Sequence, residues 1–303
     1  MRYGFIGLGN LGAHLAASLM HGGFDLVVHD LNRAAAQRLV AAGAKWAASP
    51  REMGAVSDAV ITCLPSPTAV AAVVAGKDGI LEGLKSGAAW IEMSTNDAQE
   101  IKRLAALAAA KGVATLEAPV TGGVHRAAAG EITVLVGGEK AAYEAHLPAF
   151  RAMGGEIFHM GPLGSASVMK VISNMLAFIH LGAAGEALML AKRGGLDLAQ
   201  SFAAIKASSG NSFVHETECQ VILNGSYNIG FTMDLACKDL GFALKLGREF
   251  GVPLEVAGLV EQTFIRARAQ YGGDAWSSMV VKLLEDALEK NLRAPGFPDV
   301  LVE

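Results

Sequence analysis

The chain has 303 residues, of which 52% are hydrophobic and 18% charged, and its formal net charge is -4. This length accommodates one large domain or two ordinary ones with a substantial core. The slightly acidic balance gives no electrostatic reason to expect a nucleic-acid partner. The three cysteines, Cys63, Cys219 and Cys237, show no metal-binding or redox spacing, which favours a reducing cytoplasm.

The first part of the chain, to about Gly164, alternates short β-branched segments with alanine-rich ones. Such alternation is typical of a parallel sheet that helices cover on both faces. The last strands follow one another closely, which predicts antiparallel members at the end of the sheet. The predicted strands are 2–6, 26–29, 58–63, 89–93, 114–119, 133–137 and 156–160, and the helices among them include 11–21, 34–42 and 98–111.

After Gly164 the pattern is helical, with glycine-rich breaks and no convincing strand. The predicted fold is therefore α/β: an N-terminal Rossmann-type doubly wound sheet in residues 1–164, followed by an all-α helical domain in residues 165–303. The helices predicted in this second domain are 166–193, 198–207, 212–224, 233–250, 254–271 and 277–289.

The most apolar segment, 175–191, contains His180 and Glu186. It falls short of the roughly 18 uninterrupted apolar residues typical of a membrane span. We expect it to be a helix buried on most sides. The N-terminal apolar run breaks into glycines too early for a signal peptide, so no membrane partner is expected.

A glycine-rich loop follows the first predicted strand and opens the first predicted helix. Gly7, Gly9 and Gly12 have the G-x-G-x-x-G spacing of dinucleotide-binding loops. In such loops the first glycine makes the turn, the second lets the pyrophosphate approach, and the third lets helix and strand pack closely. The helix N-terminus adds free N–H groups. The predicted cofactor loop comprises these glycines and Leu8, Asn10 and Leu11.

The choice of cofactor depends on two residues, Asp30 and Arg33, which follow the second predicted strand. Asp30 lies about 20 residues beyond the loop, where an acidic side chain binds the ribose hydroxyls of NAD and repels the 2′-phosphate of NADP. Arg33 is close enough in sequence to bind that phosphate. The alternative is that Arg33 is an ordinary solvated residue. NAD is the predicted cofactor, with NADP as the alternative.

Lys170 lies in the unusually apolar segment 164–175. Asn174 is four residues further and so on the same helical face. One interpretation is a lysine whose stem covers the core while its ammonium reaches water. The other is a functional lysine, since Lys170 follows the predicted domain junction and small-molecule sites gather in clefts between domains.

The whole chain resembles the β-hydroxyacid dehydrogenases, a family that includes 3-hydroxyisobutyrate dehydrogenases, tartronate semialdehyde reductases and glyoxylate/succinic semialdehyde reductases. The resemblance depends on four motifs, in order along residues 4–244. They are GFIGLGNLG, EAPVTGGVHRAAAGEITVLVGG, GSASVMKVISN and DLACKDLGFAL. The second is similar to the family's substrate loop D-A-P-V-S-G-G, and the third to its catalytic helix G-x-G-x-x-x-K-x-x-x-N.

Three positions depart from the family pattern. Thr121 stands where serine is usual, Glu117 where aspartate is usual, and Ala166 at the second glycine of the catalytic helix. None of these changes removes a functional group, so they bear on substrate fit rather than on chemistry.

The resemblance implies that Lys170 is the general acid/base and that Asn174 hydrogen-bonds the substrate or orients the lysine. Burial lowers the pKa of a lysine toward neutrality, so that one amine can accept and return a proton. The N–H groups of Gly122 and Gly123 form a nest suited to a carboxylate, and Thr121 adds a hydroxyl. Two loop residues that follow the glycines, His125 and Arg126, are expected either to line the rest of the pocket or to be ordinary loop residues.

The resemblance also implies a second set of cofactor contacts. Leu64 and Pro65 are expected to lie against the cofactor, and Thr95 on its nicotinamide side. Lys238 is expected to reach the cofactor from the helical domain. The alternative for Lys238 is a surface lysine paired with Asp234 on the same helix.

The predicted function is hydride transfer between NAD and a small 3-hydroxy carboxylic acid. An NADPH-dependent reductase of a small aldehyde acid is the alternative within the family. A dinucleotide-binding regulator without turnover is a more remote one. The histidines have no metal-ligand spacing, so no metal is expected. By resemblance we expect a homo-oligomer, either dimer or tetramer; the substrate within this class and the direction of reaction stay open.

Overall fold

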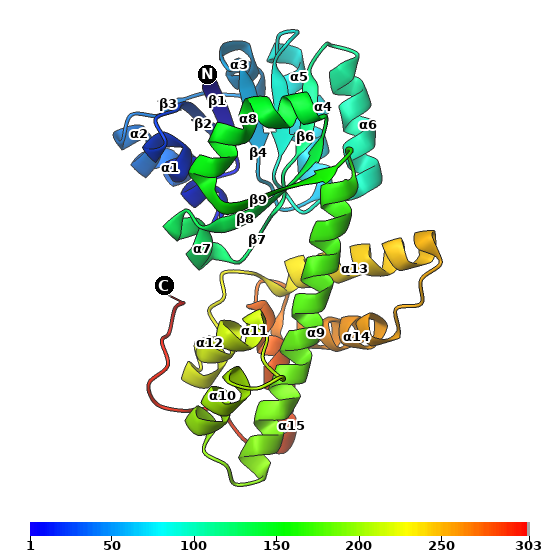
Figure 1. Cartoon of the computed structure of the whole chain (residues 1–303). Coiled ribbons are helices and arrows are strands. Elements are labelled where there is room, and N and C mark those ends of the chain that lie inside the picture. Colours follow the sequence, from blue (N-terminus) through cyan, green and yellow to red (C-terminus); the bar gives the residue numbers. More distant parts are fainter. Residues whose placement is uncertain (302–303) are drawn as a thin grey trace. The chain divides into compact units, whose positions relative to one another are not determined.

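The computed structural model describes residues 1–301. Its internal contacts divide the chain into two compact units, Met1–Lys170 and Val171–Glu303 (Figure 1). The division lies within one helix, α9 (Ser165–Arg193), rather than at the predicted boundary between residues 164 and 165. The first turn of α9 is hydrogen-bonded to a strand of the first unit, which explains why it groups with the sheet. Each unit is described by itself.

The first unit is built on a nine-stranded sheet of order β3-β2-β1-β4-β5-β6-β8-β7, with β9 paired to β8. The run β3-β2-β1-β4-β5-β6 is parallel throughout and has the Rossmann order, so the doubly wound prediction is confirmed. The strands are β1 (Arg2–Ile6), β2 (Asp25–His29), β3 (Lys45–Trp46), β4 (Ala59–Thr62), β5 (Ala89–Glu92), β6 (Ala114–Glu117), β7 (Val120–Thr121), β8 (Ile132–Gly138) and β9 (Gly154–Gly161).

The end of this sheet is more complicated than the sequence predicted. β8 runs antiparallel to β6 and β7, as expected for the last strands, but β9 pairs with β8 in parallel. A parallel pair needs a crossover connection, and α8 (Lys140–Met153) supplies it. The two-residue strands β3 and β7 were not predicted, because two residues are too few to show a period.

Two apolar cores lie on the two faces of the sheet because side chains alternate along each strand. On β1, Tyr3 and Phe5 belong to one core while Ile6 belongs to the other. α1 and α8 contribute to the first core, and α3, α4, α5 and α6 to the second. The remaining helical bounds are α1 (Gly12–His21), η1 (Arg33–Ala36), α2 (Gln37–Ala41), α3 (Pro50–Val56), α4 (Pro67–Ala75), α5 (Ile80–Gly83), α6 (Ala98–Ala109) and α7 (Val124–Ala129).

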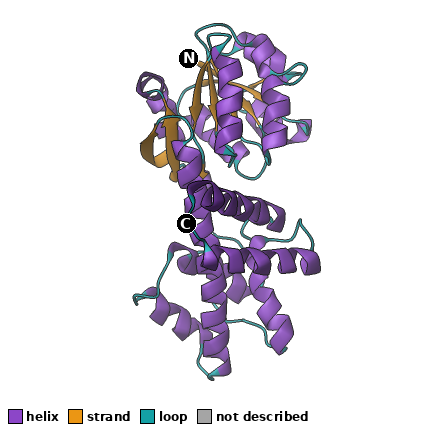
Figure 2. Ribbon diagram, turned by 90° about the vertical axis from the view of Figure 1, so that its right-hand side faces the viewer, coloured by secondary structure: helices purple, strands orange, loops and turns teal. Residues whose placement is uncertain are grey.

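The second unit consists of helices joined by loops, and its described residues contain no strand longer than the isolated bridge between Thr232 and Trp276 (Figure 2). The prediction of one helix over 212–224 is wrong, since the chain bends at Thr217 (φ -107°, ψ -75°) between two short helices. Its core includes Phe178, Leu240 and Phe264. After α9 the helices are α10 (Leu198–Lys206), α11 (Phe213–Glu216), α12 (Glu218–Asn224), α13 (Met233–Phe250), α14 (Glu255–Tyr271), η2 (Ser277–Val281) and α15 (Lys282–Leu288).

α9 is less enclosed than the sequence predicted. Ile172, Leu176 and Leu190 are exposed along it, at spacings that place exposed side chains in one stripe. By length and composition alone this helix is long and apolar enough to cross a membrane, with 28% of the apolar window buried. The expectation of a helix buried on most sides is therefore wrong for the single chain.

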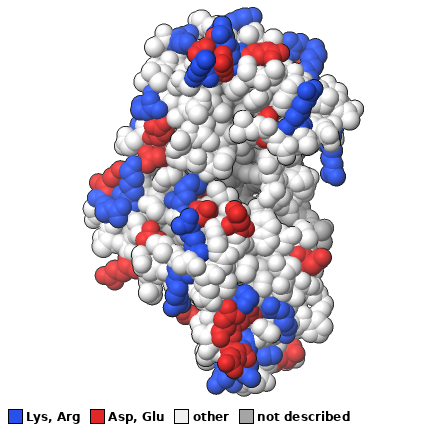
Figure 3. Space-filling view, turned by 180° about the vertical axis from the view of Figure 1, so that it is seen from behind, with Lys and Arg blue, Asp and Glu red and all other residues white. Residues whose placement is uncertain are grey.

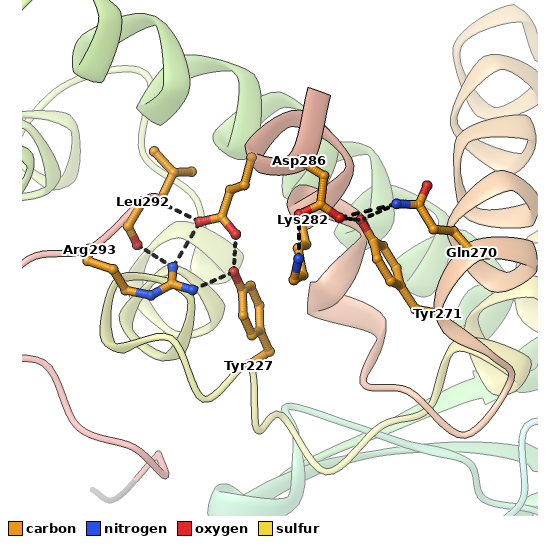
Figure 4. Close-up of polar contacts among 8 residues, drawn as sticks. Tyr227, Gln270, Tyr271, Lys282, Asp286, Leu292 and Arg293 are labelled. Atoms are coloured by element: carbon orange, nitrogen blue, oxygen red, sulfur yellow. Dashed lines mark hydrogen bonds and ion pairs between the residues drawn. The ribbon is translucent and has the colours of Figure 1, made fainter. Parts of the chain in front are cut away.

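A polar network around the buried Glu285 ties α15 and the segment after it to the loop after α12 (Figure 4). The carboxylate of Glu285 accepts hydrogen bonds from the Tyr227 hydroxyl, the Arg293 guanidinium (2.8 Å) and the Leu292 backbone N–H (2.6 Å). Arg293 also donates to the Tyr227 oxygen at 2.9 Å. Because Glu285 is 2% exposed, these donors compensate for the loss of hydration of its charge.

Candidate functional site

The glycine loop joins β1 to α1, and its three glycines meet different demands. A Cβ on Gly7 (φ +97°) would lie 2.2 Å from the Cys63 carbonyl oxygen, and one on Gly12 would lie 2.0 Å from the Gly7 carbonyl oxygen. A Cβ on Gly9 would meet nothing within 4 Å. Gly7 and Gly12 are thus needed for close backbone packing, while Gly9 borders open space, as a loop that admits a pyrophosphate requires.

Asp30 follows β2 and connects directly to this loop. Its carboxylate accepts hydrogen bonds from the backbone N–H of Leu8 (2.6 Å) and of Asn32 (2.8 Å). Arg33, which begins η1, is exposed, and its guanidinium carbon lies 5.4 Å from the centre of the Trp46 ring. The acidic residue is therefore fixed beside the glycine loop, while the basic residue packs over an aromatic ring.

A hydrogen-bonded chain crosses the carboxyl ends of β4 and β5. Thr62 donates to Glu92 (2.5 Å), Glu92 accepts from the Ser94 N–H (2.6 Å), and the Ser94 hydroxyl accepts from the Leu64 N–H (2.7 Å). These contacts hold the loop that contains Leu64 and the exposed Pro65 beside the one that contains Thr95.

The glycine loop and the segments containing Asp30, Leu64 and Thr95 all follow neighbouring parallel strands at their carboxyl ends. The order of the strands reverses between the neighbouring strands β1 and β4. This is the edge at which open α/β sheets bind ligands. The predicted cofactor residues of the first unit, Asn10 and Leu11 included, therefore share one edge.

Thr121 ends β7, and the two glycines after it lead into α7. Gly122 has φ +125°, and Gly123 has φ +91° and ψ 169°, a region that is essentially limited to glycine. His125 and Arg126 lie in the first turn of α7 and are partly buried. The loop is thus held in a backbone conformation that other residues rarely adopt.

Lys170 lies in the second turn of α9 and is only 8% exposed. The start of this helix is held by the buried carboxylate of Glu117, at the end of β6. That carboxylate accepts hydrogen bonds from the N–H groups of Gly164 and Ala166, both at 2.7 Å, and from the hydroxyl of Ser167. Lys170 therefore projects from a helix that is fixed to the sheet.

In the second unit, Asn174 is also 8% exposed and donates a 2.6 Å hydrogen bond to Asp239 of α13. Lys238 donates to the other oxygen of the same carboxylate at 2.7 Å and lies 5.0 Å from the Phe242 ring centre. Asp234, considered as its partner on the same helix, hydrogen-bonds Arg268.

Sequence reasoning did not assign a role to Asp239 or Glu117. Both carboxylates are fully buried: Asp239 lies inside α13 and Glu117 at the end of β6. The signal available was local: Glu117 is the last residue of a strand with apolar neighbours, and Asp239 precedes the buried Leu240 in an amphipathic helix. Only contacts with residues 47 to 65 positions away reveal what each holds.

The residues of the first unit fit a dinucleotide. The open side of Gly9 leaves room for phosphates, and the nearby helix N-terminus favours their charge. Within residues 1–301, no group of three or more His, Cys, Asp or Glu side chains is arranged to hold a metal ion. The cysteines at 63, 219 and 237 are not joined in disulfides.

Comparisons with known proteins agree along nearly the whole chain. Residues 2–161 match the family model described as the NAD binding domain of 6-phosphogluconate dehydrogenase. Residues 164–284 match that described as NAD-binding of NADP-dependent 3-hydroxyisobutyrate dehydrogenase.

Among curated relatives, 2-(hydroxymethyl)glutarate dehydrogenase of Eubacterium barkeri is 34% identical over 286 residues, which cover 94% of this chain and 95% of the relative. Mitochondrial 3-hydroxyisobutyrate dehydrogenase of Mus musculus is 33% identical over 268 residues, which cover 86% of this chain and 80% of the relative. The crystal structure of a 3-hydroxyisobutyrate dehydrogenase from Salmonella typhimurium is 32% identical. It superposes with a TM-score of 0.87, covering 93% of this chain and 99% of that one.

Proposed function

Because the chain belongs to the β-hydroxyacid dehydrogenase family, we propose that it transfers a hydride between NAD and a small 3-hydroxy carboxylic acid, with Lys170 as general acid/base. It is an NAD(P)-dependent dehydrogenase that acts on a small hydroxy acid. The single observation that carries the proposed role of Lys170 is its burial in an otherwise apolar turn.

The bound nicotinamide supplies the acceptor or donor of the hydride. The chain's own task is to move the hydroxyl proton and to hold the substrate. We assign the proton to Lys170, since a lysine amine can accept a proton from the substrate hydroxyl and return it. Asn174, whose amide already donates to Asp239, is assigned the orientation of the substrate hydroxyl or of the lysine.

For the carboxylate end of the substrate we assign the N–H groups of Gly122 and Gly123 and the hydroxyl of Thr121. Charge-assisted hydrogen bonds of this kind are stronger than neutral ones. Holding one end of a small acid also orients its hydroxyl-bearing carbon. His125 and Arg126 of the same loop are assigned to the far end of the substrate, which they would select by size and charge.

We favour NAD over NADP because the carboxylate of Asp30 is fixed next to the glycine loop by two backbone donors. A negative charge there opposes a 2′-phosphate. The exposed guanidinium of Arg33, held over Trp46, supports the second candidate, an NADPH-dependent reductase of a small aldehyde acid.

We further propose a homo-oligomer, dimer or tetramer, in which another copy covers the exposed apolar stripe of α9. On the face drawn in Figure 3, Lys and Arg side chains lie among Asp and Glu side chains in each unit, which supports a small-molecule rather than a nucleic-acid partner. A cytoplasmic location is proposed on the cysteine pattern, although the mouse relative is named as mitochondrial.

A steady-state assay tests the proposed function. Purified protein is given NAD or NADP with a panel of 3-hydroxy acids, and each acid is paired with its methyl ester. We expect NAD reduction with at least one free acid, and a loss in kcat/KM of about 2–4 kcal/mol for its ester, because one charged contact and the alignment it provides are lost. Equal turnover of the acid and its ester would contradict the proposed carboxylate site. Preference for NADP and an aldehyde acid would favour the second candidate.

A further inference from the structure

We infer that Glu117 is a positioning residue, whose buried carboxylate sets the place of Lys170 by holding the first turn of α9. This inference rests on the proposed role of Lys170. Glu117 is 0% exposed, so its contacts are not shared with water. It ends β6, and Thr121 of the proposed substrate loop follows only four residues later.

The carboxylate serves as an N-terminal cap that comes from a distant strand. One oxygen accepts from the N–H groups of Gly164 and Ala166, and the other accepts from the Ser167 hydroxyl. The first turn of α9 contains no acidic residue of its own. The N–H groups at a helix start lack partners within the helix, and a carboxylate there also interacts favourably with the helix dipole.

The sheet leaves room for this carboxylate. Gly137 of β8 is the register partner of Glu117, and a Cβ on Gly137 would lie 2.3 Å from the Glu117 oxygen that binds the two N–H groups. A residue with a side chain at 137 would therefore displace the cap.

Helix geometry carries the constraint from the cap to the lysine. Lys170 is four residues after Ala166 and three after Ser167, so it lies on the same face, about 6 Å further along the axis. A hydrogen-bonded helix does not bend freely over one turn, so a shift of the first turn moves the base of the Lys170 side chain. One carboxylate thus links the strand that leads to the substrate loop with the helix that presents Lys170.

The test compares Glu117→Ala, which removes the cap, with Glu117→Gln, which keeps its size. The glutamine oxygen still accepts from both N–H groups, and its amide donates to the Ser167 hydroxyl. We expect kcat to fall about 10–100-fold in Glu117→Ala, the loss typical of a slight misplacement of a catalytic group. KM and the Kd for NAD should change less than threefold, and Glu117→Gln should keep kcat within about fivefold.

Glu285→Ala is the matched control. Glu285 is an equally buried glutamate that also accepts a backbone N–H, but it lies in the second unit, within the network of Figure 4. We expect this variant to lose thermal stability and to retain kcat per folded molecule. An equal loss of kcat in Glu285→Ala, or a Glu117→Ala variant with kcat within twofold of the parent, would overturn the inference.

A second readout does not depend on turnover. The rate at which an amine-directed acylating reagent labels Lys170, measured by peptide mass spectrometry, should change at least threefold in Glu117→Ala and not in Glu285→Ala or Glu117→Gln. Should the parent protein oxidise none of the acids, the proposed function fails while the labelling still tests the cap. An unchanged labelling rate in Glu117→Ala would contradict the positioning role whether or not turnover is found.

Discussion

The side-chain amide of Asn174 donates a 2.6 Å hydrogen bond to the carboxylate of Asp239, which is 65 residues further along the chain and fully buried. Lys238 donates to the other oxygen of that carboxylate. Asp239 therefore holds two of the residues to which family resemblance assigns a role, one from α9 and one from α13.

Asp239→Ala should release both partners and lower kcat/KM by about 10–100-fold, because a misplaced orienting group costs alignment. Asp239→Asn keeps one acceptor for Asn174 and should lose less. Steady-state kinetics checks both variants at a temperature well below their Tm. Full activity in folded Asp239→Ala would show that the position of Asn174 does not depend on this contact.

Lys170→Ala should lower kcat by about 10²–10⁴-fold, the contribution typical of a general acid/base. The Kd for NAD should barely change, because the glycine loop is part of a different segment. Lys170→Arg should be nearly as damaging, since a guanidinium does not release its proton near neutral pH. Kinetics and cofactor titration separate these effects, and near-normal turnover of either variant would make Lys170 an ordinary packed lysine.

Asp30→Asn should raise kcat/KM with NADP relative to NAD. Asparagine retains one acceptor, which suffices for the Leu8 N–H that Asp30 binds at 2.6 Å, while the contact with the Asn32 N–H is lost together with the charge. We expect the NADP/NAD ratio of kcat/KM to rise about tenfold, equivalent to roughly 1.4 kcal/mol. Arg33→Ala is the companion variant. A parent protein that already prefers NADP, and loses that preference in Arg33→Ala, would assign cofactor choice to Arg33.

Gly123→Ala should lower kcat/KM by at least tenfold. The backbone of Gly123 has φ +91° and ψ 169°, where other residues incur about 1–3 kcal/mol of strain, and a Cβ would lie 2.9 Å from the His125 ring. Gly87→Ala is a suitable control, because Gly87 also has a positive φ (+87°) but borders open space away from the loop. We expect Gly87→Ala to lower the Tm without lowering kcat/KM, and an equal kinetic loss in both variants would argue against a specific role of the loop.

Glu218 should make stability depend on pH. One of its carboxylate oxygens is buried without a hydrogen-bond partner among the described residues, and burial raises its pKa from 4.5 to about 8. Between these values the folded protein keeps a proton that the unfolded chain releases, so the free energy of unfolding falls as pH rises from about 4.5 to 8. Thermal melts of the parent and of Glu218→Gln check this. The variant should lose part of the slope across that window, and identical slopes would contradict the prediction.

The sequence by itself determined the fold class and the order of the main elements. Strands of four or more residues have a clear apolar pattern, and β1 was predicted with its observed bounds, 2–6. The spacing of Gly7, Gly9 and Gly12 predicted a turn whose close contacts the structure contains. Both signals are local: they depend on neighbouring residues and on conformations that only glycine adopts easily.

Only the tertiary structure decided which distant groups meet. The sequence pattern did not predict that Glu117 caps α9, that Asn174 binds Asp239, or that β9 pairs with β8 in parallel. It also did not predict the bend at Thr217 or the exposed stripe of α9. A buried carboxylate looks the same in sequence whichever donor satisfies it. Its partner is set by chain topology, which brings together residues that no local period connects.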